Sequence, residues 1–472
     1  MVGGPLVTAV GRSGADPAPL FPHGVASGDT TADRVVLWTR AALRDGSPRD
    51  LRWWLATDPQ RSNPVGGGVV TARPEDDGTV SVEVTGLRPG TTYWYGFAAD
   101  GPLRLTSTPS AVGRTRTLPG PGADRVRMAV VSCSDLETGW FNAYARIADR
   151  DDLDLVVHLG DYIYEYGTGG GDLPDAAPPL PGREHSPRIE LLTLDQYRGR
   201  YAQYRTDPDL QRLHAAHPML SIWDDHEVAD DSWAFGAQAH QPEDGSWADR
   251  WTAAMTAWHE WHPRSAADPQ AWRGFRLGDL VDASLVDGRS HRPRRGDPAI
   301  AGTIDDGLGR PQRQWLERRL GRPAGRWPLV LTQQPVTQRW NPDRFPLGFA
   351  GWAGFPAAQR RLLDAVRTAG ATLISGDVHS GWLLESADAV EAVTPSVSSR
   401  CFADKHSARR ARAYERDLLA ANPDLRWTDQ RHHGYLIVDA DAERLRLEWW
   451  FVDTVEERST GERLAMVKEI RA

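Results

Sequence analysis

Residues 21–118 contain short apolar segments that are separated by turn-forming residues. Val80, Val82 and Val84 alternate with polar neighbours, and the aromatic residues of 92–97 alternate with smaller ones. This period of two is typical of half-buried strands. We therefore predict a small, all-β sandwich with strands near residues 34–40, 51–55, 79–84 and 92–97.

A different pattern follows the Pro/Gly-rich stretch Leu118–Ala123, whose composition is typical of a domain boundary. Strand-like runs now alternate with helical stretches, which predicts a largely parallel sheet covered by helices. Residues 434–439 and 444–452 are predicted to form an antiparallel pair that closes a second sheet. We expect a tail over 1–20, the β-sandwich over 21–118 and an α/β domain over 124–472. The predicted strands of that domain are 126–131, 153–159, 219–223, 280–286, 329–332 and 372–375, and its predicted helices are 141–148, 247–261, 312–320 and 357–368.

The composition excludes several classes of protein. With 472 residues, 40% of them hydrophobic and 25% charged, the chain is expected to be globular and to form two domains. The formal net charge of −9 argues against general nucleic-acid binding, which depends on Lys and Arg. No run approaches the roughly 18 apolar residues of a membrane helix, so no membrane span is expected. Two cysteines, Cys133 and Cys401, allow one disulfide at most, which excludes a disulfide scaffold.

Four predicted strands end in side chains that bind metals or phosphate. Taken singly, each has a common structural explanation: a buried thiol often packs as a small hydrophobe, and an Asp pair often caps a helix. Parallel strands bring their carboxyl ends to one edge of a sheet, so these residues are expected to converge there. Their joint occurrence predicts a metal site. The segments are Ser132–Asp135, Gly160–Tyr164, Trp223–Glu227 and Ser375–His379.

These segments carry a family resemblance. The blocks His158-Leu-Gly-Asp-Tyr-Ile-Tyr-Glu165, Trp223-Asp-Asp-His-Glu-Val228, Gly376-Asp-Val-His379 and Val393-Thr-Pro-Ser-Val-Ser-Ser399, together with Ser132-Cys, resemble the PhoD-like (alkaline phosphatase D) metallophosphoesterases. The resemblance implies an α/β four-layer, calcineurin-like metallophosphoesterase sandwich. Its amino-terminal domain would be all-β and fibronectin III/Ig-like, and the turn before Tyr93 is similar to such domains.

The same resemblance implies an enzyme that hydrolyses phosphate diesters, and often monoesters, through a metal-bound hydroxide. The implied cofactors are one ferric iron and one or two calcium ions. Residue chemistry agrees, because a thiolate and a phenolate suit ferric iron, whereas calcium prefers carboxylate oxygens. We expect Cys133, Asp161 and Tyr164 to bind iron and Asp225, Asp230 and Asp377 to bind the harder cation, with Asp161 able to bridge.

Three further residues are expected near the phosphate. By resemblance, His226 and His379 would donate hydrogen bonds to the ester or act as a general acid. Arg289 has two interpretations: it could fork onto a phosphate oxygen, or it could hold the adjacent acidic loop together. The chain also departs from the family pattern, with Asp230 where Asn is common and Ala353 where Asp is frequent.

Two alternatives remain open at this point. One is a phospholipase D-like diesterase of the same family, and the other is a non-catalytic phosphate- or glycan-binding protein that uses Trp223, Trp233, Trp340 and Trp352 for stacking. We expect a monomer acting on a small-molecule or polymer phosphate ester. Family members are usually exported, but residues 1–20 show no export signal, so the sequence leaves the localisation open.

Overall fold

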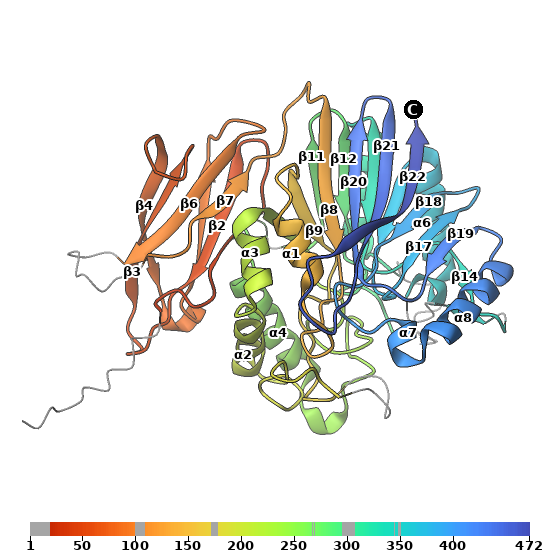
Figure 1. Cartoon of the computed structure of the whole chain (residues 1–472), viewed down its shortest axis with the longest axis horizontal. Coiled ribbons are helices and arrows are strands. Elements are labelled where there is room, and N and C mark those ends of the chain that lie inside the picture. The colour runs from red at the N-terminus through yellow and green to blue at the C-terminus, as the bar shows by residue number, and fades with distance from the viewer. Residues whose placement is uncertain are drawn as a thin grey trace, which may run out of the picture.

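The structure is a computed structural model that describes residues 19–99, 109–170, 178–266, 268, 270–294, 307–343, 345–347 and 351–472. The expected tail over residues 1–20 lies almost entirely outside these described residues. Three large layers of strands and two groups of helices make up the fold (Figure 1).

The first sheet has nine strands, and its centre is parallel. Strand β9 pairs in parallel with both β8 and β10, and their residues are buried almost throughout. Near-continuous Val and Leu are expected where a strand is covered on both faces. The order across the sheet is β22 (Glu462–Arg471), β21 (Arg444–Val452), β20 (Gly434–Asp441), β8 (Arg125–Val131), β9 (Leu155–His158), β10 (Pro218–Ser221), β1 (Val25–Gly28), β2 (Arg34–Arg40) and β5 (Thr79–Thr85).

The second sheet has seven strands, and side chains on its two faces enter different layers. On β13, Leu329 and Leu331 pack into the core shared with the first sheet, whereas Val330 packs with residues of α5 and α6. This alternation follows from the two-residue period of a strand. The order is β11 (Arg273–Leu277), β12 (Val281–Leu285), β13 (Trp327–Leu331), β16 (Thr372–Ser375), β18 (Val390–Val393), β17 (Gly381–Glu385) and β19 (Leu425–Asp429), and β14 (Arg339–Trp340) pairs separately with β15 (Pro346–Leu347).

Helices cover the outer faces of the two large sheets. In Figure 1, α2, α3 and α4 lie between the amino-terminal strands and the central sheets, and α7 and α8 lie on the opposite side of the molecule. None of the helices in the described part of the chain combines the length and apolar composition needed to cross a bilayer. The helices are α1 (Asn142–Ala148), α2 (Leu194–Tyr204), α3 (Pro208–Ala216), α4 (Trp247–Trp261), α5 (Arg310–Gly321), α6 (Pro356–Ala369), α7 (Phe402–Lys405) and α8 (Ala408–Ala421).

The amino-terminal strands form two facing layers, as the alternation of polar and apolar residues predicts. A four-stranded antiparallel sheet of β4 (Pro64–Ala72), β3 (Arg49–Ala56), β6 (Thr92–Ala99) and β7 (Gly113–Arg116) shares a hydrophobic core with β2 and β5. This region is continuous with the central sheet, because β1 pairs in parallel with β10 through Ser27 and Gly28. It therefore shares a sheet with the α/β region, which the sequence did not predict.

Two expectations about topology are wrong. The sheets are mixed and not largely parallel, because hairpins add antiparallel strands at both ends of each parallel centre. The strands β20 and β21 do form an antiparallel pair, but they extend the first sheet beyond β8 and do not close the second. The physical reason is that the apolar residues of β20 match the buried edge of β8 over six consecutive pairs.

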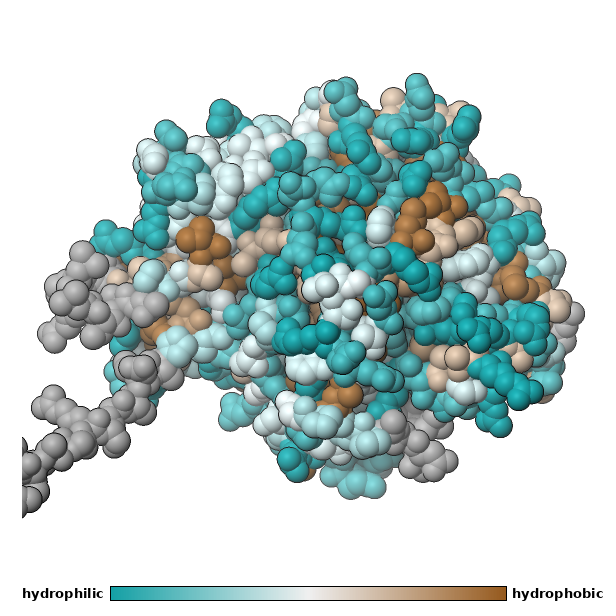
Figure 2. All heavy atoms as spheres, viewed as in Figure 1, coloured by the Kyte–Doolittle hydropathy of each residue, from teal (hydrophilic) through white to brown (hydrophobic). Residues whose placement is uncertain are grey.

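The surface seen from the same side as in Figure 1 is mostly hydrophilic, with hydrophobic side chains in small separate patches (Figure 2).

Candidate metal centre

The candidate ligands lie on tight turns at the ends of parallel strands. Cys133 and Asp161 follow β8 and β9, and both adopt left-handed backbone angles, with φ of 60° and 55°. Asp377 and His379, which follow β16, do the same, with φ of 68° and 50°. Non-glycine residues adopt this conformation at a cost, and such strain concentrates at functional sites. These turns bring the side chains of distant segments to one point.

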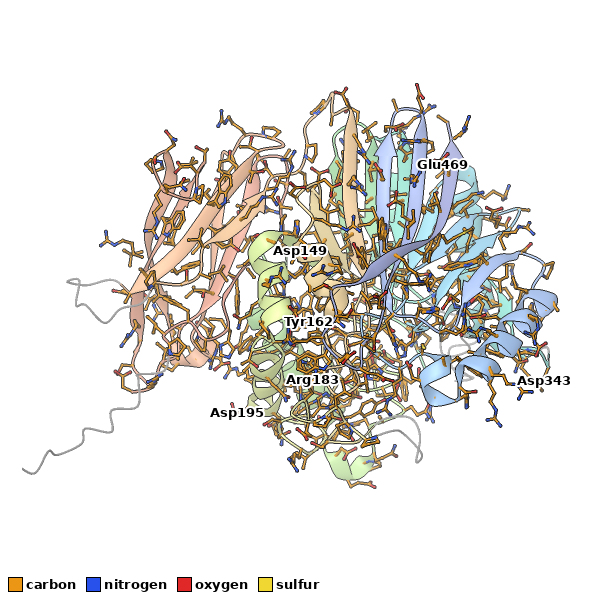
Figure 3. All side chains as sticks on the ribbon, viewed as in Figure 1. Asp149, Tyr162, Arg183, Asp195, Asp343 and Glu469 are labelled. Carbon is orange, nitrogen blue, oxygen red and sulfur yellow. The ribbon has the colours of Figure 1, made fainter. Side chains whose placement is uncertain are left out.

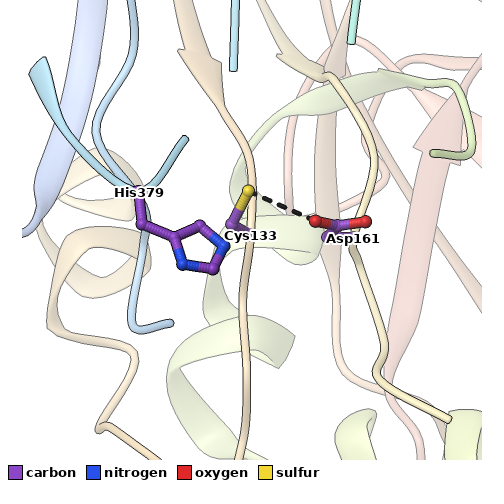
Figure 4. Close-up of side chains that lie close together, drawn as sticks. All are labelled: Cys133, Asp161 and His379. Atoms are coloured by element: carbon purple, nitrogen blue, oxygen red, sulfur yellow. Dashed lines mark hydrogen bonds between the residues drawn. The ribbon is translucent and has the colours of Figure 1, made fainter. Parts of the chain in front are cut away.

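The side chains of Cys133, Asp161 and His379 lie close together (Figure 4), and Tyr164 is within hydrogen-bonding distance of two of them. The Cys133 thiol donates to Asp161 Oδ2 at 3.4 Å, and the Tyr164 hydroxyl lies 3.3 Å from the same oxygen. The Tyr164 hydroxyl is also 3.3 Å from Nε2 of His379. Because His379 Nδ1 bonds the carbonyl oxygen of Arg400 at 3.1 Å, the lone pair of the ring is left on Nε2, facing the cluster. His379 therefore joins the cluster as a potential ligand.

The charge balance of this cluster fits a cation. Asp161 is 2% exposed, and its Oδ1 makes no hydrogen bond with any described residue. Burial, followed by neighbouring carboxylates, raises the pKa of Asp161 well above its usual value, although His226 opposes this. Burial and the nearby Asp161 likewise raise the pKa of Cys133 and of Tyr164. A bound metal ion would remove this penalty, because it favours the deprotonated form of each donor.

A second group of carboxylates surrounds Arg289. The guanidinium lies 2.5 Å from Asp224, 3.2 Å from Asp225 and 3.4 Å from Asp377, and it is 1% exposed. Burial alone would raise the pKa of Asp225, but Arg289 and His226 hold it at about 2. Oxygen atoms of Asp224, Asp225 and Asp377 come close enough together to hold one hard cation.

The nitrogens of Arg289 differ in whether a carboxylate occupies them. Its Nε and one terminal nitrogen are occupied by carboxylates, which favours a role in holding the acidic loops together. Its remaining nitrogen, Nη1, is buried, makes no hydrogen bond within the described residues and lies 3.8 Å from Asp231. That nitrogen leaves one donor for a phosphate oxygen, so the two interpretations are compatible.

His226 stands between the two groups. Its Nδ1 lies 2.9 Å from Glu165, and its ring stacks on Tyr164 with centroids 4.2 Å apart. Burial opposes the charged ring, but Glu165, Asp161 and Asp225 raise the pKa of His226 well above 6.5. The Nε2 atom of His226 lies 4.0 Å from Asp230. The ring is thus fixed in orientation, with one nitrogen held by Glu165.

Asp230 is placed at the edge of the site. Its backbone NH donates to Glu165 at 2.6 Å, and its side chain groups with Asp225 and Asp231. Asp231 was not among the residues predicted from the sequence, yet its backbone NH donates to Asp225 at 2.7 Å. Ala353 lies in the short 3-10 helix Trp352–Gly354 and offers no ligand atom.

Glu227 positions the ligand turns and was also missed. Its carboxylate accepts from the backbone NH of Asp161, Tyr162 and Asp224 at 3.1, 2.7 and 2.8 Å. It therefore ties the turn after β9 to the turn after β10. Figure 3 shows Tyr162 at the centre of the molecule, among the loops that these turns begin. The Asp-Asp-His-Glu run contained Glu227, but a side chain that binds backbone NH groups leaves no spacing signal in the sequence.

The tryptophans that could stack on a ligand do not lie together. Trp223 and Trp352 are 6% and 5% exposed, and Trp223 packs edge-on against Trp258 at 4.9 Å. Trp340 lies on β14, whereas Trp233 lines a cavity beside the site. In the described chain both cysteines are free thiols.

Comparisons with known proteins agree with this geometry. The sequence model of the PhoD-like phosphatases matches residues 128–449, and that of their N-terminal domain matches residues 8–119. Alkaline phosphatase D of Bacillus subtilis (strain 168) is 35% identical over 398 residues, covering 77% of this chain and 65% of that protein. The matched part is thus slightly less than two thirds of the relative's length.

Two solved structures extend the comparison. The structure of PhoD has a TM-score of 0.84 and 28% identity, covering 97% of this chain and 91% of that one. Purple acid phosphatase PPD1 from yellow lupin seeds has a TM-score of 0.59 and 14% identity, covering 95% of this chain and 73% of that one. This second match shows a similarity of fold only.

Proposed function

Since the chain belongs to the PhoD-like phosphatase family, we propose that it is a metal-dependent phosphoesterase and that the candidate metal centre is its catalytic site. The observation that carries the proposal is the buried, unpaired Oδ1 of Asp161 beside Cys133, Tyr164 and His379. A buried carboxylate oxygen without a partner is costly, and a cation is the ligand that satisfies it.

The donor set divides into a soft and a hard half. Cys133, Asp161, Tyr164 and His379 would hold a ferric iron, because thiolate and phenolate suit that ion. The carboxylates of Asp225 and Asp377 would hold calcium, with Asp161 between the halves. Asp230 belongs to a second carboxylate group that also contains Asp225, and it would add a further oxygen ligand. When bound, the metals would supply a nucleophilic water and positive charge for the phosphoryl oxygens.

The chain's own residues orient and protonate the ester. Glu165 fixes Nδ1 of His226, so the proton on Nε2 is directed away from Glu165 and can be given to the departing oxygen. The Nη1 of Arg289, which makes no hydrogen bond within the described residues, can donate to a non-bridging oxygen of the phosphate. Burial of these groups excludes water and strengthens each contact.

The remaining assignments belong to the same proposal. The amino-terminal strands over 21–118 form a fibronectin III/Ig-like domain, and 124–472 form the catalytic domain. The chain acts as a monomer on small or polymeric phosphate esters, which include the diesters of a phospholipase D-like enzyme. The two facing sheets of antiparallel strands support the sandwich. The pairing of β1 with β10 supports a fixed placement of the amino-terminal strands on the catalytic domain.

Hydrolysis of bis(p-nitrophenyl) phosphate and p-nitrophenyl phosphate tests the proposal. The chain is stripped with a chelator and then supplied with Fe³⁺, Ca²⁺ or both, and turnover and bound metal are measured. We expect the chelator to abolish turnover and the two metals together to restore it. Failure to hydrolyse either ester under any metal condition would favour the non-catalytic binding protein.

A matched pair of variants locates the metal. Cys133→Ser should lower bound iron and turnover by more than about tenfold. Cys401→Ser replaces the other buried cysteine and should keep both. Equal iron content in the two variants would contradict the proposed ligand set.

A further inference from the structure

A cavity of about 660 Å³ lies beside the metal centre. It is formed by the segment between the turn at Asp231 and the start of α4, together with residues 292–294 and Phe355. Its volume falls in the range of pockets that enclose small ligands.

Two residues of the cavity lining are in contact with the acidic side of the candidate metal centre. Asp231 lines the cavity, and its backbone NH holds Asp225. Arg292 lines it as well and donates to Gln334 at 2.6 Å, while Gln334 in turn donates to Asp377 at 3.4 Å. A phosphate at the metal centre would therefore have one of its ester groups at the mouth of this cavity.

The lining is rich in aromatic rings. Trp233, Phe235, His240, Trp247 and Phe355 all contribute. The ring of His240 meets Trp247 edge-on with centroids 5.3 Å apart, so aromatic rings already contact one another on this wall. Aromatic ligands are bound by stacked and edge-to-face contacts of this kind.

Core packing explains only part of this lining. Phe355 is 7% exposed and belongs to the core under α6, but Phe235 is 81% exposed. Exposing a phenylalanine ring to water is unfavourable, and exposed apolar groups next to a polar site commonly mark binding surfaces. The guanidinium of Arg294 lies 5.4 Å from the ring centroid of Trp233 and holds that ring against the wall.

We propose that this cavity binds an aromatic ester group of the substrate, so that the enzyme prefers aryl or nucleobase-bearing phosphate esters over alkyl ones. The inference rests on the proposed function, since it places the phosphate at the metal centre. Phe235 and Trp233 are the specificity-determining residues, and they act on the ester group and not on the phosphorus.

Two non-hydrolysable ligands test the inference. Phenylphosphonate and methylphosphonate share the charged group and differ only in the organic group, and their affinities for the metal-loaded full chain are measured by titration calorimetry. We expect phenylphosphonate to bind about tenfold more tightly. In Phe235→Ala and in Trp233→Ala this ratio should fall to about two.

Phe345→Ala is the matched control, because Phe345 is a 67% exposed ring outside the cavity lining that the described residues form. It should keep the tenfold ratio. A ratio near one in the unmodified chain would overturn the inference, and so would a high ratio that both cavity variants keep. If methylphosphonate also failed to bind, the result would contradict the proposed function itself. If methylphosphonate bound and the ratio were near one, only the proposal for the cavity would be wrong.

Discussion

At the scale of single residues, the distances within the metal centre are set by turns and not by the strands themselves. Cys133 and Asp161 are joined by a backbone hydrogen bond from Cys133 NH to the carbonyl oxygen of Gly160 at 3.1 Å. The Ser399 hydroxyl donates to the Tyr164 hydroxyl at 2.7 Å and so fixes the phenol. Preorganised donors of this kind bind a metal without first rearranging.

Tyr164→Phe tests whether the phenolate binds iron. The substitution keeps the ring that stacks on His226 but removes the oxygen, so we expect ferric iron affinity to fall at least about tenfold and the visible absorption of the iron-loaded chain to shift. Titration with ferric iron, followed by absorbance and bound metal, measures both. Tyr166→Phe, two residues along the same segment, is the control, and an unchanged spectrum in Tyr164→Phe would exclude the phenolate ligand.

Arg289→Met tests whether the guanidinium stabilises the fold by neutralising the carboxylates around it. In the chelated chain the variant leaves Asp224, Asp225 and Asp377 buried together, so we expect the free energy of unfolding to fall by about 3 kcal/mol. Metals should reduce the loss, because they supply the missing positive charge. Urea unfolding followed by tryptophan fluorescence measures it in both states.

Arg318→Met, on the exposed face of α5, is the control for this substitution and should change the unfolding free energy by less than about 0.5 kcal/mol. If Arg289→Met left folding unchanged and raised only KM, its main partner would be the phosphate.

The sequence predicted this site unevenly. Cys133, Asp161, Tyr164, Asp225 and Asp377 follow apolar strands, so the edge where they meet could be predicted from periodicity and from the family resemblance. The groups that position the ligands could not be predicted. Glu165 and Glu227 accept hydrogen bonds from backbone NH groups and from a side-chain nitrogen that are far away in the sequence.

At the scale of elements, α7 is connected to the metal centre through a buried histidine. His433, just before β20, lies 2.9 Å from Asp404 of α7 and 2.9 Å from the Ser396 hydroxyl. Ser396 forms an isolated bridge with Ser132, the residue before Cys133. The contacts of His433 therefore brace the turn that carries the thiol.

This pair predicts a dependence of stability on pH. Burial opposes the charged ring, but the bond to Asp404 and the nearby Cys401 raise the pKa of His433 from 6.5 to about 10. Because the folded-state pKa exceeds the unfolded one, the stabilisation is complete below pH 6.5 and is lost as the pH rises to about 10. We expect this to remove about 5 kcal/mol from the unfolding free energy.

Urea unfolding between pH 6 and pH 10 measures the effect as a difference between the unmodified chain and His433→Gln. The difference should be largest at the acid end and vanish near the alkaline end. His291→Gln, at an exposed ring, should give no such trend. A constant difference across the range would show that His433 stabilises the fold without its charge.

Several helices and strands were predicted, and other helices were missed. The predicted helices at 247–261 and 312–320 correspond to α4 and α5, and the predicted strand at 372–375 corresponds to β16. In contrast, α8 was missed, because its ARRARAYERDLLAA sequence buries only Ala411, Leu418 and Ala421. A helix held by so few apolar contacts gives a weak periodic signal.

At the scale of the whole molecule, strand order could not be predicted, since it depends on pairings between distant segments. The joint between β1 and β10 is the main example. It is supported by Trp38, which donates from Nε1 to the carbonyl oxygen of Glu260 at 2.7 Å and packs on Trp261. The guanidinium of Arg205 lies 4.4 Å from the centroid of the Trp38 ring.

Trp38→Ala tests whether the two parts unfold together. Trp38 is fully buried between β2 and α4, so its truncation should cost about 3–5 kcal/mol. If the amino-terminal strands are an integral part of the sheet that carries Asp161 and Asp225, thermal inactivation and loss of tryptophan fluorescence should move down together, in one transition. Trp340→Ala, at a ring that is 36% exposed, should move neither by more than a few degrees. Separate transitions in Trp38→Ala, with inactivation at the original temperature, would show that the metal centre is independent of the amino-terminal strands despite their shared sheet.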